Sequence, residues 1–518
     1  MAYAEDMNAE PRRRRSADRA HKGAAPIPQL APRDVANPYP PMELLSADQV
    51  EAIHDASMHI LEDFGIEVMS KRALALFEKA GAIVDHASQN VRIGRELVAE
   101  ALKTTRPLYT LTPRNPKRRV ILGGNNINFT LVAGPPNVHD RERGRRAGNL
   151  RDYRDLVRLA QHFNAITMIG NQVCAPIELP ANSRHLDTYF ANLTLTDKSF
   201  HCTAIGRGRA LDGIEMMAIS RGLTLEEMAK DPGVTTIISV NSPRRFDDQM
   251  AEGLMTMAEY GQSACVTPFT LMGAMSPVTL AGALAQQNAE ALFGVVLTQL
   301  VRPGAPVMYG AFTSNVDMKS GAPAFGTPEN TKANIASGQL ARHYRLPYRT
   351  TPGSASNAAD AQGTYETMMA LWGAILGHGN LIYHAAGWQE GGLTASFEKF
   401  VIDVEMIQHM MEFLKPIEVN EGELALDALS RVPTGGHFFG EPHTLERYQT
   451  AFYQPILSNW QNYEAWKEAG GLDATQRATA VWKKALEEYQ EPAMDLARRE
   501  ALEAYVAKRK EAIGSGEP

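Results

Sequence analysis

The sequence predicts an α/β protein, a (β/α)8 TIM barrel with an N-terminal extension of helices and strands and a C-terminal helical tail. Eight short apolar runs recur roughly every thirty to forty residues along the middle of the chain, each followed by a segment with helical periodicity. Strands that alternate with helices of this length pair in parallel through right-handed crossovers. The predicted strands are residues 127–132, 166–173, 198–205, 235–240, 264–271, 306–311, 346–351 and 380–386. The predicted helices include residues 150–163, 208–220, 247–260, 280–300, 328–344, 364–376 and 397–413.

The barrel is expected over residues 123–415, between two flanking regions. Residues 1–43 contain a basic run and scattered prolines, which predict a disordered tail. Residues 44–122 are expected to form accessory helices and strands, because Ser46 and Gln49 make a capping-box pair ahead of a helix and a sheet-like stretch follows at 108–122. Residues 416–518 are expected to supply a lid segment and the helical tail.

The composition is that of a large globular enzyme and excludes some other classes. The chain has 518 residues, of which 44% are hydrophobic and 21% charged, and its net charge of −7 argues against a nucleic-acid partner. No apolar stretch reaches the length needed to cross a bilayer, so no membrane partner is expected. Three widely spaced cysteines do not suggest a disulfide framework, and they favour a reducing, cytoplasmic location.

The segment that leaves the eighth strand carries the densest functional signal. His384, Trp388 and Glu390 occur there together with three glycines. Glycines let a backbone approach a ligand closely, and the face of a tryptophan ring attracts a cation. The alternative is structural: Trp388 fills the mouth of the barrel and His384 is a buried core histidine.

Strands six and seven add further candidates at the same end of the barrel. Tyr309 and Phe312 place two rings near the mouth, although ordinary core packing would explain them equally well. Arg349 is suited to bind a carboxylate through two parallel hydrogen bonds. Alternation along the strand does not decide whether Arg349 faces inward or lies outside the barrel beside a helix.

Several common kinds of site have no counterpart in the sequence. There is no C-x-x-C or H-x-E ligand pair, and the cysteines fall on different strands, so no bound metal is expected. His201 and Cys202 are adjacent in a strand and cannot both face the lumen. Neither a dinucleotide-binding G-x-G-x-x-G, a P-loop nor a G-x-S-x-G nucleophile turn occurs in the expected context.

One block outside the barrel, residues 435–444, is rich in glycine and aromatic residues, and it is either a lid over the mouth or a rigid joint for the tail. Together with other motifs, this block resembles the trimethylamine methyltransferase family. The motifs are Gly436-His437-Phe438, His443-Thr444, Tyr463-Glu-Ala-Trp466, Gly470-Gly471, Asp360-Ala-Gln362, Gly387-Trp388, Gly391-Gly392 and the segment 397–403. The resemblance runs from about residue 44 to about residue 486. It implies a TIM barrel that transfers a methyl group from an amine to a cobalt corrinoid held by a separate small protein.

The founding members of that family carry pyrrolysine at the mouth of the barrel. Its equivalent is expected here in the loop around residues 352–356, where the chain has only standard residues. A quaternary ammonium already has a neutral tertiary amine as its leaving group, so it does not need the activation that pyrrolysine would supply. The resemblance therefore implies a quaternary amine such as glycine betaine as the methyl donor.

The hypothesis from the sequence is methyl transfer from a betaine to the cob(I)alamin of a corrinoid protein, without acid or base catalysis. Tyr309, Phe312 and Trp388 would enclose the cation, Glu390 would add negative potential, and His384 or Arg349 would take the carboxylate. The rim residues expected to meet the corrinoid protein are Asn137, Ser356, Asn357 and His437; the alternative is that each is an ordinary loop residue. A TIM barrel that binds quaternary amines without catalysis, or with a different reaction, is the alternative function. We also expect a homo-oligomer.

Overall fold

The computed structural model of the chain describes residues 26–170 and 172–514. All eight predicted strands are present in it, some of them shorter than predicted. They are β7 (Asn126–Leu131), β10 (Met168–Ile169), β11 (Ser199–Phe200), β12 (Thr235–Val240), β14 (Ser263–Met272), β15 (Val307–Gly310), β18 (Tyr348–Thr350) and β19 (Leu381–Ala386). Each is followed by a long helix before the next strand: α4 (Leu150–His162), α5 (Arg184–Leu195), α6 (Arg207–Arg221), α8 (Asp248–Glu259), α9 (Leu280–Val301), α10 (Pro328–His343), α11 (Ala361–Leu376) and α12 (Phe397–Phe413). A short helix, α7 (Leu225–Met228), also precedes β12.

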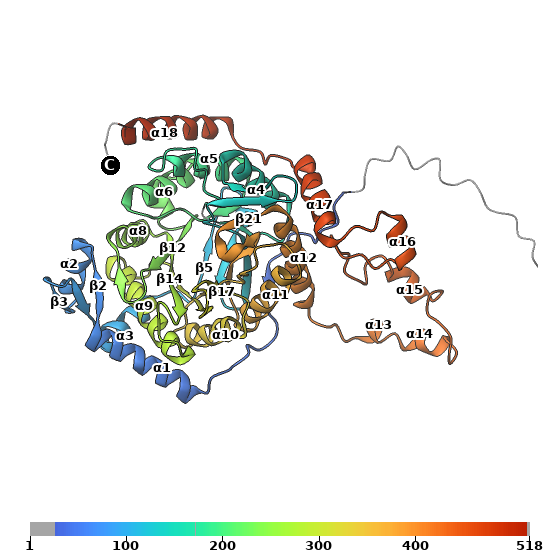
Figure 1. Cartoon of the computed structure of the whole chain (residues 1–518), viewed down its shortest axis with the longest axis horizontal. Helices are drawn as coiled ribbons and strands as arrows, with labels where there is room; N and C mark the ends of the chain where they lie inside the picture. Colours follow the sequence, from blue (N-terminus) through green and yellow to red (C-terminus); the bar gives the residue numbers. More distant parts are fainter. Residues whose placement is uncertain (1–25, 171, 515–518) are drawn as a thin grey trace, which may run out of the picture.

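The strands pair in parallel in the order β11–β10–β7–β19–β18–β15–β14–β12. A single parallel bridge between His201 and Thr235 links the two ends of this order. The backbone N–H of Cys202 donates to the Thr235 carbonyl at 2.9 Å beside that bridge. The long helices surround the strands (Figure 1). The structure is thus a mixed α/β fold with a parallel sheet, and the carboxyl ends of all eight strands point the same way.

An antiparallel hairpin covers the amino ends of these strands. Its two strands are β5 (Leu108–Leu111) and β6 (Val120–Gly123), which confirms the sheet-like stretch expected at 108–122. The hairpin buries Tyr109 and Leu122 in a cluster with Met168 and Leu381, residues that begin β10 and β19. The Tyr109 hydroxyl lies 2.8 Å from the Ser263 hydroxyl at the start of β14. Because this end is closed, a ligand reaches the interior from the carboxyl ends.

The N-terminal extension packs on the outside of α9. It contains α1 (Ala47–His59), a π-helical turn (Ile60–Phe64), α2 (Lys71–Lys79), α3 (Arg95–Thr104), β2 (Ile66–Val68), β3 (Ile83–Asp85) and β4 (Asn90–Arg92). The three strands form a small sheet with β13 (Arg245–Phe246), which follows β12. The predicted capping box of Ser46 and Gln49 begins α1. The Phe77 ring stacks on Phe293 of α9 at 4.5 Å.

Residues 26–43, expected to be part of a disordered tail, are folded against the rest of the chain. Residues 1–25 lie outside the described part of the chain, but β1 (Val35–Ala36) pairs with β7, and Ile27 and Val35 are buried. Prolines in this segment remove donors without preventing an edge strand, so proline content alone overestimated the disorder.

The C-terminal region wraps the outside of the helical layer. Helices α17 (Ala474–Glu488) and α18 (Leu496–Gly514) lie against it, with Trp482 packed on Phe397 and Arg509 paired with Asp212 at 2.7 Å. Between α12 and α17, residues 415–472 form a projecting segment, here called the arm (Figure 1). It carries α13 (Glu421–Leu424), α14 (Leu426–Arg431), α15 (Pro442–Arg447) and α16 (Tyr463–Glu468). The arm stands at the side of the molecule, so the lid expected in this region does not cover the strand ends. No helix in the described residues is long and apolar enough to span a bilayer.

Candidate functional site

A cavity of about 540 Å³ opens at the carboxyl ends of the strands. Residues from β12, β14, β18 and β19, and from the segments that follow β7 and β11, contribute to its wall. Its rings are Phe269, Phe312, Tyr383 and Trp388, its cation is Arg349, and its imidazoles are His201 and His384. Among the described lining residues there is no aspartate or glutamate. The wall is therefore aromatic, with one positive charge and no carboxylate.

The aromatic wall is fixed from behind. Phe312, the first residue of β16 (Phe312–Val316), meets Phe269 at 4.9 Å and the edge of Trp388 at 6.0 Å between ring centroids. The Trp388 ring nitrogen donates to the Ser354 carbonyl at 3.1 Å. Ser354 belongs to the loop after β18, which Glu366 holds by accepting hydrogen bonds from the Ser354 hydroxyl and from two backbone N–H groups. The indole therefore keeps one orientation without a ligand.

The loop from His384 to Gly392 has an unusual backbone. His384 has a φ of +62° and Glu390 a φ of +57°, a region that residues other than glycine seldom adopt. As a result Tyr383 and His384 both line the cavity, although neighbours in a regular strand point to opposite faces. Gly392 lies directly under Trp388, where a Cβ atom would come within 2.4 Å of the indole. The Asp403 carboxylate anchors the loop by accepting the Gly387 N–H at 2.8 Å.

Arg349 is a buried cation with no counterion among the described residues. Its side chain is 1% exposed, and its guanidinium carbon lies 5.4 Å from the Phe312 ring centroid and 5.0 Å from that of Tyr383. One N–H donates to the Ala311 carbonyl at 3.3 Å, and Nε has no partner in the described structure. Burial lowers its pKa, yet a guanidinium keeps its proton. An unpaired buried charge is costly, so this arrangement suits a ligand that brings an anionic group.

The two histidines of the cavity are neutral. The Nδ1 atom of His384 accepts the Ala133 N–H at 3.1 Å, which leaves its proton on Nε2. Burial, aided by the charge of Arg349, lowers the pKa of His384 well below 6.5. Burial also lowers the pKa of His201 to about 3, and its Nδ1 pairs with the Tyr383 hydroxyl. Neither imidazole is poised to exchange a proton near neutral pH.

Of the six expected substrate-binding residues, Phe312, Arg349, His384 and Trp388 line this cavity, and Tyr309 and Glu390 do not. The structure corrects the placement of Tyr309: its hydroxyl bonds to Asn288 at 3.0 Å and to Gln287 at 3.3 Å on α9, outside the strands. Glu390 instead pairs with Arg145 at 2.8 and 3.0 Å.

Three of the four expected rim residues meet around the turn at residues 389–393, and His437 lies apart from them. The Ser356 carbonyl accepts the Glu390 N–H at 2.8 Å, and the Asn357 carbonyl accepts the Gln389 side-chain N–H at 2.8 Å. Asn137 donates to the Leu393 carbonyl at 3.0 Å within a small sheet above the strands. That sheet consists of β8 (Asn137–Asp140), β9 (Gly144–Ala147), β20 (Trp388–Gln389) and β21 (Thr394–Ser396), and it borders the 3-10 turn Glu390–Gly392. Ser356 is buried in the turn that begins α11, where its hydroxyl contacts Asp360 at 3.2 Å, whereas Asn357 is exposed. His437 lies on the arm, with its ring 5.5 Å from that of Phe439.

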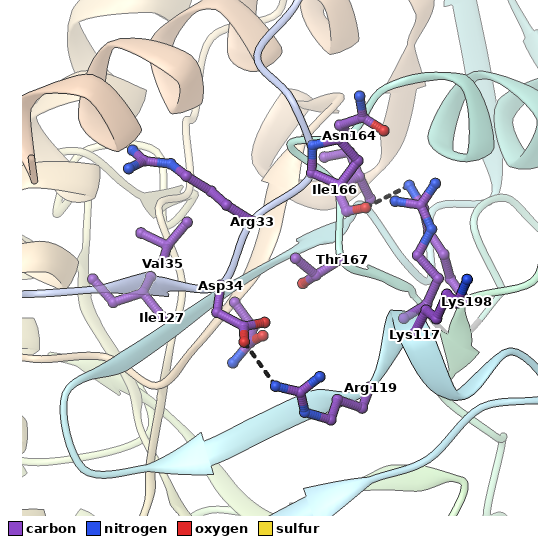
Figure 2. A pocket seen from close by; sticks show the side chains of 13 residues that line it. Arg33, Asp34, Val35, Lys117, Arg119, Ile127, Asn164, Ile166, Thr167 and Lys198 are labelled. Carbon is purple, nitrogen blue, oxygen red and sulfur yellow. Dashed lines mark hydrogen bonds and ion pairs between the residues drawn. The ribbon is translucent and has the colours of Figure 1, made fainter.

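A second cavity, of about 250 Å³, lies near the amino ends of the strands and is lined by Arg33, Lys117, Arg118, Arg119 and Lys198 (Figure 2). Four of these five cations, Arg33, Arg118, Arg119 and Lys198, have partners in the described structure. Lys198 donates to the carbonyls of Ala160, Phe163 and Ile166 at 2.6 to 2.9 Å, and Arg119 pairs with Asp34 at 3.0 Å. Paired charges at this end are typical of stability rather than chemistry. In the described residues, no group of three or more His, Cys, Asp or Glu could hold a metal ion.

The chain is similar to known methyltransferases over nearly its whole length. It is 35% identical over 476 residues to the glycine betaine methyltransferase of Desulfitobacterium hafniense (strain Y51), covering 92% of this chain and 98% of that protein. The trimethylamine methyltransferase MttB of another strain of that organism is 29% identical over 447 residues, covering 86% and 89%. The proline betaine:corrinoid methyltransferase of Eubacterium limosum is 25% identical over 485 residues, covering 89% and 96%. Residues 11–514 match the family described as Trimethylamine methyltransferase (MTTB). The chain therefore belongs to the trimethylamine methyltransferase family, as its motifs predicted, and is a methyltransferase.

Proposed function

We propose that this protein takes a methyl group from a betaine and passes it to the cob(I)alamin of a corrinoid protein, inside a closed (β/α)8 barrel. The observation that carries the proposal is the unpaired, buried guanidinium of Arg349 beside an aromatic wall that has no carboxylate. The names of the glycine betaine and proline betaine relatives support the same substrate class. The bridge between His201 and Thr235 supports closure of the barrel.

A betaine matches the cavity because it carries both charges. Its carboxylate would pair with Arg349, and its quaternary ammonium would rest against the ring cluster of Phe269, Phe312 and Trp388. Choline and tetramethylammonium bring a second cation and no anion, so they would leave Arg349 unpaired and be repelled by it. We therefore expect the site to require a carboxylate on the donor.

The chemistry needs no proton transfer from the protein. The reduced corrinoid supplies the cobalt nucleophile, and the nitrogen leaves as a neutral tertiary amine. The neutral His201 and His384 fit this, since no side chain of the cavity is held in a state suited to acid or base catalysis. The residues of the cavity position the N-methyl group toward the opening and exclude water.

The rim of the cavity is suited to a protein partner. Segments that leave the strand ends expose large apolar side chains: Ile177, Ile205, Val278, Met318 and Leu393. Exposed apolar groups around an opening mark a docking site. We place the corrinoid protein on this rim, where its cofactor would face the cavity, and the protein itself in the cytoplasm, where three free, buried cysteines stay reduced.

The test is methylation of free cob(I)alamin and of a corrinoid protein, followed by the visible spectrum. Glycine betaine, proline betaine, choline and trimethylamine are offered in turn. We expect transfer from a betaine and none from choline or trimethylamine. Transfer from choline at a comparable rate would contradict the role of Arg349. Tight betaine binding without any transfer would instead indicate a non-catalytic binding barrel.

A further inference from the structure

The arm, residues 415–472, has almost no core of its own. Only Ala428 and Leu457 are buried within it. Its large apolar side chains face solvent. Among the aromatic ones, Phe439 is 81% exposed, Phe452 75% and Trp460 72%. The other exposed apolar side chains of the arm are Ile417, Val419, Leu424, Leu426, Leu429, Phe438, Leu445, Tyr448, Tyr463 and Leu472. A segment with this composition is stable only when another surface covers it.

Polar contacts, rather than packing of its apolar side chains, hold the arm in its conformation. Arg431 pairs with Glu441 at 2.9 Å, and His443 lies 3.2 Å from the Gly422 carbonyl, which ties its outgoing and returning halves together. At the root, Glu405 of α12 accepts the Ile456 N–H at 2.7 Å and the Tyr453 hydroxyl at 2.9 Å. The arm is thus held out from the molecule (Figure 1), and its rings stay exposed.

We propose that the arm of one copy docks on a second copy of this chain, and that the two copies exchange arms across a two-fold axis. The five most exposed aromatic side chains of the arm present on the order of 700 Å² per copy, given ~200 Å² for a whole ring side chain. A stable interface needs about 800 Å² per partner, so the arm alone nearly supplies it.

The occupant must stay in place throughout the reaction cycle. A corrinoid protein that delivers and removes a methyl group binds and leaves, and its departure would return these rings to water at every turnover. Permanent interfaces are the more apolar class, and most of them join copies of one chain. An apolar surface that must stay covered needs a partner that is always available. A second copy of the chain meets this requirement, because it is present whenever the protein is made.

A receiving surface lies beside the root of the arm. On α11, Tyr365 is 62% and Met369 43% exposed, and Trp372 lies on the same helical face. The Trp372 ring packs against Phe413 at 5.0 Å, and Phe413 packs against Tyr39 at 5.3 Å, which makes one continuous apolar patch. Since the arm leaves α12 just after Phe413, a two-fold axis beside this patch brings each arm onto the patch of the other copy.

The test is the mass of the full-length protein in solution, measured by light scattering and by sedimentation without any other protein. We expect a dimer or a multiple of it. Phe439→Asp with Phe452→Asp on the arm, and separately Met369→Asp on α11, should weaken dimerisation by about a hundredfold or more. Ile83→Asp is the matched control, because Ile83 is 59% exposed on β3 and lies far from the arm (Figure 1). That variant should remain a dimer.

Mixing the arm variant with the α11 variant tests whether the arm binds a second copy of the chain or another partner. An arm variant and an α11 variant retain one intact arm-to-patch contact when they pair, so the mixture should form heterodimers that neither variant forms alone. Phe439 and Phe452 are largely exposed and Met369 is 43% exposed, so circular dichroism should show unchanged folding. A monomeric wild-type protein at micromolar concentration overturns the proposal, as does a dimer that tolerates the arm variants. If the wild-type protein is monomeric and the arm variants lose only the binding of the corrinoid protein, the arm is a docking site for that partner instead.

Discussion

Replacing Arg349 by methionine should raise stability and abolish selectivity for betaine. Arg349 is 1% exposed and has one hydrogen bond of 3.3 Å, so the protein alone compensates its charge poorly. Methionine fills a similar volume without a charge. Removing such a buried charge is expected to increase the free energy of unfolding of the ligand-free protein by about 1–4 kcal/mol.

Activity should move in the opposite direction. The substrate carboxylate would lose a buried, charge-assisted contact, which is worth about 3–5 kcal/mol when one partner is removed. This converts to a loss of roughly two to four orders of magnitude in kcat/KM for glycine betaine. Choline should gain relative to betaine, because the variant no longer repels a lone cation.

The assay combines urea unfolding, with and without glycine betaine, and initial rates of cobalamin methylation. Arg342→Met is the matched control: Arg342 is a half-buried guanidinium on α10 that donates to the Gly377 carbonyl at 2.9 Å, outside the cavity. We expect that change to lower stability and leave the betaine rate unchanged. The reasoning about Arg349 is refuted if its methionine variant is less stable than the wild type and still discriminates betaine from choline.

Three further changes test the remaining parts of the site. Gly392→Ala should displace Trp388 and lower kcat/KM about tenfold or more, whereas Gly391→Ala should not, because no atom lies closer than 3.7 Å to the Cβ position of Gly391. Tyr309→Phe should cost about 1–2 kcal/mol in urea unfolding and leave kcat/KM unchanged, because its hydroxyl bonds only outside the strands. Below pH 6.5 the unfolded chain protonates His384 and the native chain does not. The free energy of unfolding should therefore decrease by about 1.4 kcal/mol for each unit by which the pH is lowered, as far as this group is concerned. His384→Asn, which keeps a residue tolerant of positive φ, should remove that part of the slope.

Each of these has a clear contrary result. Equal activities of the two glycine variants would show that the orientation of Trp388 does not matter. A loss of betaine affinity in Tyr309→Phe would return that ring to the cation site. An unchanged pH slope in the His384 variant would mean that the native protein takes up the proton there.

The strand and helix order could be predicted because period-two and helical patterns alternate along the whole middle of the chain. The alternation of side chains along a strand could also have predicted that only one of the two rings faces the cavity. Tyr309 and Phe312 are three positions apart and cannot face the same side of a regular strand. In β14 the same rule brings Cys265, Thr267 and Phe269 to the inner face, and the last two line the cavity. Helix α5 was missed because its asparagine and threonine residues weaken the helical pattern.

Other parts of the site depend on features that no local pattern records. Tyr383 and His384 share the cavity only because the backbone of His384 turns to a positive φ, and the sequence does not show such a turn at a histidine. The ion pair that removes Glu390 from the cavity involves Arg145, which is distant in the sequence. The arm is equally non-local: its glycine and aromatic block was visible, but its position beside the barrel depends on the contact between Glu405 and residues 453–456.

The charges of the cavity follow from what methyl transfer requires. Positive charge leaves the substrate nitrogen in the transition state, so a carboxylate beside the ammonium would stabilise the bound substrate more than the transition state and slow the step. In the proposed complex, rings rather than a carboxylate would face the ammonium and attract it weakly. The one charge of the described cavity, Arg349, would meet the substrate carboxylate, whose charge does not change during the reaction. Binding energy is thus drawn from the end of the substrate that does not react. The same logic explains why the two imidazoles are kept neutral, since a proton on either would add a second cation and oppose binding of the ammonium.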